Sequence, residues 1–137
     1  MTKTIDKFIS CLSLGGIMAF INIVFGTIDY SFSFLMLVMA LDYLTGILCG
    51  WVDKSLSSNK ATRGLFKKFF IFIYVIIAHH LDMLLHVDYV RMGVCYMYAM
   101  GEVISIIENG TRLGVPVPQP IKKALEILNN KVENEEE

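Results

Sequence analysis

The chain has 137 residues, of which 55% are hydrophobic and 18% are charged, and its formal net charge is −1. Soluble globular proteins have about 45–50% apolar and about 25% charged residues, so this composition favours a membrane protein. The length allows one compact unit and is too short for a second domain, and the charge balance gives no indication of nucleic-acid binding. The three cysteines have neither CxxC nor Cys/His spacing, which argues against a zinc site or a disulfide framework.

Four long apolar stretches follow one another along the chain. They are Phe8–Ile28, Ser31–Val52, Phe69–Leu85 and Val90–Ile107. Because about 20 apolar residues cross roughly 30 Å of hydrocarbon, they predict an all-α, polytopic integral membrane protein with about four transmembrane helices. The first stretch exceeds the roughly 7–15-residue core of a signal peptide, so we expect a retained span. We expect spans one and two to form a tight hairpin and spans three and four to be joined by a similarly short loop.

The basic residues predict the orientation of the spans. If both termini are cytoplasmic, all of the 12 Lys and Arg residues except Arg91 lie on the cytoplasmic side, as the positive-inside rule requires. The membrane domain then covers residues 1–110, and residues 111–137 form a cytoplasmic tail. A three-span form, with the first or fourth stretch lying at the interface, is the alternative, because the fourth stretch has few strongly apolar residues and also contains an acid.

Two polar segments are expected in the cytoplasm. The middle loop, residues 53–68, contains Lys60, Arg63, Lys67 and Lys68. We interpret these residues as a topology signal at the membrane surface, and attraction to anionic lipid headgroups is the functional alternative. The tail begins with a Pro-rich linker over 114–120. A short amphipathic helix is predicted to follow, lying on the membrane or on a neighbour, and then the acidic end Glu133–Glu137.

Three acids lie inside the apolar stretches, and the first of them has small and polar neighbours. A charge near the centre of a membrane helix costs about 2.5–3.5 kcal/mol, so three such acids indicate contacts with protein or water rather than lipid. Asp42, Thr45, Gly46 and Gly50 share one helical face. Small residues let helices approach closely, so this face predicts an oligomer interface or a pore lining. The alternative is a lone acid that is protonated and merely tolerated.

The later spans contain further polar groups that we assign to the same interface or pore lining. His79 and Asp82 share a face in span three with His86, and Glu102 shares one with Ser105 in span four. A hydrogen-bonded His–Asp pair is the favoured interpretation of span three, with pH sensing as an alternative. One helix rarely supplies three metal ligands, so we predict no metal site. The sequence has no GxSxG, HExxH, P-loop or GxGxxG motif, so we predict neither enzymatic activity nor a cofactor.

Several of these features occur in a characteristic order. Asp42 and Gly46 lie in an early span and are followed by a basic segment with Gly64, Lys67 and Lys68. Asp82 comes late in the next span. The last span contains Glu102-x-x-Ser105-Ile106-x-Glu108-Asn109, and Gly114-x-Pro116-x-Pro118 and a short amphipathic helix follow it. Over about residues 42–132 this order resembles the toxin-secretion/phage-lysis holin family. Members of that family are often described with three spans, which differs from the four predicted here.

The resemblance implies a small membrane protein of a bacteriophage of Gram-positive bacteria, or one encoded beside a clostridial toxin gene. Such holins accumulate in the bacterial cytoplasmic (inner) membrane, form homo-oligomers and open lesions at a set time. Through this pore formation an endolysin leaves for host cell lysis, or a large toxin is secreted. The expected partners are therefore the protein itself, the lipid bilayer and functionally an endolysin or toxin, with no nucleic acid.

Two other functions are compatible with the sequence. A small ion or proton channel, or a transporter subunit, would use the intramembrane Asp, His and Glu residues as a relay. A structural membrane subunit would instead dock a soluble partner through the basic loop and the C-terminal helix. The absence of an inverted repeat suited to transport, together with the ordered motifs, favours the holin.

Overall fold

The computed structural model describes residues 2–54, 58–124 and 126–127. In this part the chain forms four long helices: α1 (Thr2–Phe25), α2 (Tyr30–Val52), α3 (Ser58–Leu85) and α4 (Val90–Arg112). Residues 119–124 add a short helical segment that starts where the amphipathic helix was predicted. No strand occurs in the described ranges, which confirms the predicted all-α fold. Much of the predicted amphipathic helix, and the acidic end Glu133–Glu137, lie outside the described residues.

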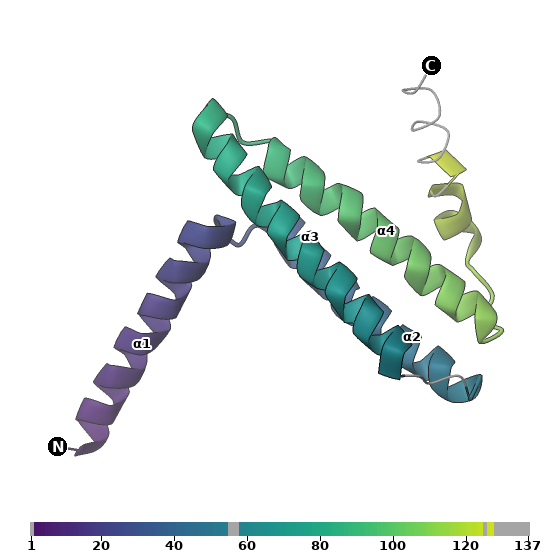
Figure 1. Ribbon diagram of the computed structural model, residues 1–137, viewed down its shortest axis with the longest axis horizontal. Helices are drawn as coiled ribbons and strands as arrows, with labels where there is room; N and C mark the ends of the chain where they lie inside the picture. Colours follow the sequence, from purple (N-terminus) through teal and green to yellow (C-terminus); the bar gives the residue numbers. More distant parts are fainter. Residues whose placement is uncertain (1, 55–57, 125, 128–137) are drawn as a thin grey trace.

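Helices α2, α3 and α4 pack side by side as a bundle, and α2 packs most extensively on α4 (Figure 1). Helices α2 and α4 run in the same direction, because Asp29 pairs with Arg91 where both begin and Asp53 pairs with Arg112 where both end. Helix α3 runs the opposite way and packs mainly on α4. We call the end formed by residues 26–31 and 82–91 the Arg91 end of the bundle, and the opposite end the Arg112 end.

The buried face of each bundle helix follows spacings of three and four residues, which place its members on one side of the helix. We call these faces together the seam. On α2 the seam consists of Ser31, Leu35, Val38, Asp42, Thr45 and Cys49, on α3 of Lys68, Ile71, Val75, Ala78 and Asp82, and on α4 of Arg91, Cys95, Ala99, Glu102, Ser105 and Asn109. Its apolar middle, with Leu35 and Val75 fully buried, is the core of the molecule. The seam thus combines an apolar core with several charged side chains.

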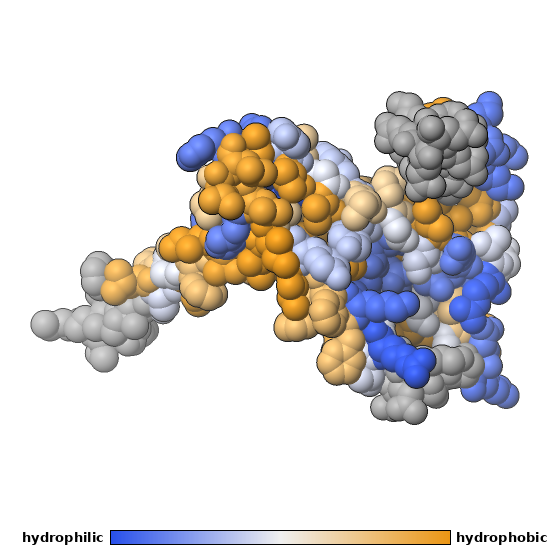
Figure 2. Space-filling model, turned by 45° about the horizontal axis from the view of Figure 1, so that its top comes forward, coloured by the Kyte–Doolittle hydropathy of each residue, from blue (hydrophilic) through white to orange (hydrophobic). Residues whose placement is uncertain are grey.

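The outer faces of the bundle are apolar and exposed. Leu37, Leu44 and Leu48 on α2 are each at least half exposed, as an environment of lipid would require. Figure 2 shows hydrophobic residues over the left and centre of this view, whereas hydrophilic residues gather at the right, the Arg112 end. Three helical segments are long and apolar enough to cross a membrane: Tyr30–Val52, Thr62–Leu85 and Val90–Arg112. The apolar segment Ser10–Phe25 of α1 is shorter, so the molecule has three to four spans.

Helix α1 does not form the expected hairpin with α2. The turn between them is short, as predicted, but the described part of α1 packs mainly on α3 and meets α2 where the ring of Phe25 contacts that of Phe32, and α1 diverges from the bundle (Figure 1). Gly26 redirects the chain with a φ of +81°, a backbone conformation that favours glycine. A Cβ at Gly26 would lie 2.8 Å from Nδ1 of His79, so the close approach of α3 also requires glycine.

Two helix boundaries also differ from the predicted ones. Helix α3 begins at Ser58, so residues 58–68, expected as loop, form its first turns. Helix α4 continues past Ile107, where the fourth apolar stretch ends, to Arg112. The side chain of Asn109 contacts α2 instead of capping its own helix, and the chain reverses after Leu113 at Gly114, whose φ is +79°.

Candidate functional site

A cluster of three charged side chains joins the bundle helices near the middle of α2 and α4. The ammonium of Lys68 on α3 lies 3.0 Å from Oδ2 of Asp42 on α2 and also pairs with Oε2 of Glu102 on α4. The three side chains are only 12–17% exposed. We call these residues the central triad. It contains two acids and one base, so its charges balance only in part.

A second polar layer lies beside the central triad, toward the Arg112 end. The side-chain amide of Asn109 donates to Oγ1 of Thr45 at 3.1 Å and to Oδ1 of Asp42 at 3.4 Å. The side chain of Ser105 also lies near the Asp42 carboxylate. The thiol of Cys49 donates to the backbone oxygen of Asn109 at 3.1 Å. Asp42 is therefore tied to α4 through several neighbours at once.

The structure therefore brings Asp42, Thr45, Glu102 and Ser105, all predicted site residues, into one polar group inside a single bundle. Gly46 lies at its edge, where an added Cβ would be 3.9 Å from the Asn109 amide, and Gly50 is half-buried. The sequence did not reveal Asn109 or Lys68 as members. Lys68 was expected at the membrane surface, but its ammonium is the counter-ion of the two acids. Lys68 lies three residues before the buried Ile71, which lies four before the buried Val75. This helical spacing is the signal that places Lys68 on the seam.

The remaining basic residues of that segment behave differently. Arg63 and Lys67 are exposed, and within the described part of the chain neither has a hydrogen bond or an ion pair. The side chain of Lys60 lies outside the described residues. At the end of the bundle, Arg112 pairs with Asp53 at 2.7 Å, but both are exposed enough that the pair contributes little. The unpaired cations therefore face away from the seam.

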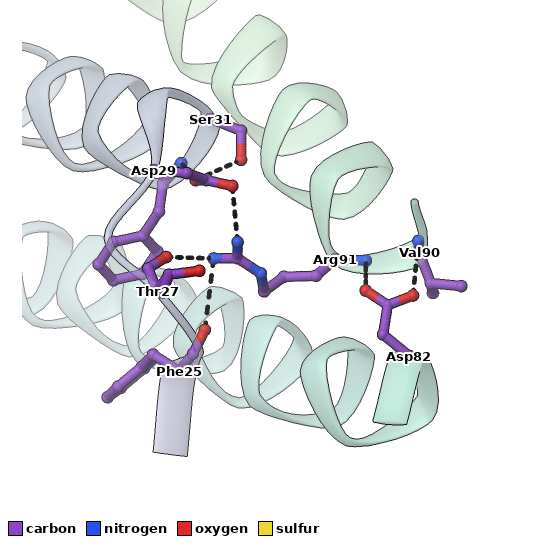
Figure 3. A network of polar contacts seen from close by, with 8 residues as sticks. Phe25, Thr27, Asp29, Ser31, Asp82, Val90 and Arg91 are labelled. Carbon is purple, nitrogen blue, oxygen red and sulfur yellow. Dashed lines mark hydrogen bonds and ion pairs between the residues drawn. The ribbon is translucent and has the colours of Figure 1, made fainter. Parts of the chain in front are cut away.

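Arg91 organises a second polar network at the Arg91 end (Figure 3). Its Nη2 lies 2.6 Å from Oδ2 of Asp29, and its Nη1 donates to the backbone oxygens of Thr27 at 3.1 Å and Phe25 at 3.4 Å. One guanidinium thus holds the end of α1, the turn after it and the start of α2. Arg91 is the residue that the predicted orientation left outside, and this exception to the charge rule is the signal that could have identified it.

Asp29 lies in the turn between α1 and α2 and caps α2. Its Oδ1 accepts hydrogen bonds from the backbone N–H of Phe32 at 2.9 Å and from the hydroxyl of Ser31 at 2.8 Å. Partial burial raises the pKa of Asp29, but these two hydrogen bonds and the charge of Arg91 outweigh it. The pKa of Asp29 therefore lies below its ordinary value, and the carboxylate stays ionised for its contact with Arg91.

Asp82 has a role that differs from the predicted one. Its two carboxylate oxygens accept hydrogen bonds from the backbone N–H groups of Val90 and Arg91, each at 2.9 Å, and so cap the start of α4 (Figure 3). Asp82 therefore closes the turn between α3 and α4 instead of joining the Asp42 group. His79, expected to pair with Asp82, instead lies against the end of α1, near the backbone of Ile23 and Gly26.

No group of three His, Cys, Asp or Glu side chains that could hold a metal ion occurs in the described part of the chain. The polar groups instead pair with one another across helices. What this arrangement offers chemically is a set of charges and hydrogen-bonding groups hidden inside an apolar bundle. They become available to water or to another chain only if the bundle helices separate.

Comparison with known proteins identifies the family. The profile of the bacteriophage holin family matches residues 19–130, which include all of α2, α3 and α4. An uncharacterized 14.9 kDa protein of the nagH 3′ region of Clostridium perfringens is 42% identical over 122 residues, 88% of this chain and 90% of that protein. The uncharacterized protein Lin0175 of Listeria innocua is 34% identical over 130 residues, 94% of this chain and 91% of that protein. No solved structure matches the chain. The chain belongs to the bacteriophage holin family, which confirms the resemblance seen in its sequence.

Proposed function

We propose that this protein is a holin that accumulates in the bacterial cytoplasmic membrane, forms homo-oligomers and opens lesions. An endolysin or a large toxin then leaves the cytoplasm through them. The observation that carries this proposal is the seam, in which the central triad lies inside a bundle whose outer faces are apolar. Membership of the holin family supports the same function. Both termini are taken to be cytoplasmic, because this places every basic residue except Arg91 on that side.

The proposed mechanism is an exchange of contacts along the seam. In the closed bundle, Asp42 and Glu102 are paired with Lys68, and the side chains that face lipid are mostly apolar. At high density in the membrane, α2 and α4 of one copy separate and pair with neighbouring copies. The polar side of the seam then faces water and lines an opening. Because protein–protein contacts replace those lost from the bundle, the free-energy difference between the two arrangements is small enough for density to decide between them.

The proposed function is tested by inducing expression in a bacterium while following membrane potential and release of a cytosolic reporter enzyme together. A holin lesion collapses the potential and releases the enzyme at the same time. Loss of potential with the enzyme retained would instead support a small ion or proton channel. Neither event, with the protein present in the membrane, would support a structural subunit.

A further inference from the structure

A groove of about 520 Å³ lies between α3 and α4 on the outside of the bundle. Its walls are largely aromatic, with Phe66, Phe70 and Tyr74 from α3 and Tyr98 from α4. The rings of Tyr74 and Tyr98 are stacked, with centroids 5.8 Å apart and planes 5° from parallel. The groove lies within the apolar segments Thr62–Leu85 and Val90–Arg112, so in a membrane it opens toward lipid.

One end of the groove is basic. Lys67 lines it, and Arg63 lies one helical turn earlier on the same face of α3, toward the Arg112 end. Both side chains are exposed and have no partner within the described residues. Glu102 also lines the groove, but its carboxylate is paired with Lys68. Two cations without a partner in the described residues therefore lie at this end of the groove, and long side chains of this kind extend toward the membrane surface.

We propose that this groove binds one anionic phospholipid, with the headgroup phosphate on Lys67 and Arg63 and an acyl chain along the aromatic wall. Basic pockets between membrane helices bind anionic headgroups in this way. Charge complementarity favours a lipid over a helix of a second copy. The apolar segment Ser10–Phe25 of α1, which diverges from the bundle and exposes most of its side chains, has no acidic side chain to meet the two cations.

The test uses tryptophan fluorescence quenching by brominated lipid. Trp51 is the single tryptophan of the chain, so a Trp51→Phe background gives a silent protein. Phe70→Trp then places a reporter in the groove, and Leu37→Trp places one on the lipid-facing surface of α2. Each protein is reconstituted in phosphatidylcholine vesicles that contain a small, equal fraction of either brominated phosphatidylglycerol or brominated phosphatidylcholine.

The proposal predicts that brominated phosphatidylglycerol quenches the groove reporter several-fold more effectively than brominated phosphatidylcholine, and that the α2 reporter shows no such preference. Replacing Arg63 and Lys67 together by Ala should remove the preference, and replacing either one alone should reduce it. Replacing Lys122 and Lys123 by Ala removes equal charge elsewhere and should leave it intact.

Three results would overturn the proposal. Equal quenching of the groove reporter by both lipids would mean that the groove takes any lipid. A preference that survives loss of Arg63 and Lys67, or that is equal at the α2 reporter, would mean that no specific headgroup site exists there. Quenching of the α2 reporter alone would mean that a second copy fills the groove.

Discussion

Replacing Lys68 by Met should make the protein open its lesions early. The substitution keeps the length of the side chain but removes the counter-ion of Asp42 and Glu102. These side chains are 12–17% exposed, so solvent screens their pairing weakly. Removing one partner of a buried ion pair costs about 3–5 kcal/mol, because a charge is left uncompensated. About 1.4 kcal/mol changes an equilibrium constant by a factor of ten. The population of the closed bundle relative to the open form should therefore fall by at least about 100-fold.

The assay is the time from induction to enzyme release, with the amount of protein in the membrane measured by immunoblot. That second measurement separates early opening from poor insertion. Lys67→Met is the matched control. It removes the same charge at the neighbouring position, where the lysine has no partner within the described residues. The triple variant Asp42→Asn, Lys68→Met, Glu102→Gln restores a neutral group and should delay release again. If Lys68→Met at normal membrane levels released enzyme no earlier than Lys67→Met, the reasoning would be refuted.

Two further predictions concern the Arg91 end. Gly26→Ala should lower the free energy of unfolding in detergent by about 1–2 kcal/mol or more, because residue 26 has a positive φ and the added Cβ would contact His79. Gly16→Ala is the control and should not lower it, because a Cβ there meets nothing within 4 Å. Equal thermal melting of both variants would contradict this prediction. Because the folded pKa of Asp29 is depressed, its contribution to stability is present above the ordinary value of 3.8 and is lost as pH falls below it. Thermal melting measured against pH should show this loss of stability in the wild type and a smaller loss in Asp29→Asn. Identical pH profiles of the two proteins would contradict the prediction.

Much of the fold follows from local sequence. The apolar stretches Ser31–Val52, Phe69–Leu85 and Val90–Ile107 correspond to the cores of α2, α3 and α4, because about 20 apolar residues in lipid have few alternatives to a helix. The intramembrane acids Asp42 and Glu102 indicated an internal polar contact for the same reason. Both conclusions depend on the free energy of transferring a residue into hydrocarbon, which follows from the residue type alone.

The partners of those acids could not be predicted in the same way. Lys68 is 26 residues from Asp42 and 34 from Glu102, so their meeting depends on how three helices pack. The charge rule counted Lys68 with its neighbour Lys67, although the two point to different sides of α3. The direction of α1 was missed because a short turn suggests a hairpin, whereas Gly26 and the contacts of Arg91 redirect the chain.

The central claim is that α2 and α4 must separate for a lesion to open, and a reversible cross-link between them tests it most directly. Ser31 of α2 and Cys95 of α4 are both buried and lie near each other on the seam, so Ser31→Cys places two thiols in reach of each other at the Arg91 end. In a Cys11→Ser background, with Ser31→Ala as the control, the oxidised protein should enter the membrane and release no reporter enzyme until a reductant is added. Release by the fully cross-linked protein at the rate of the control would contradict the account.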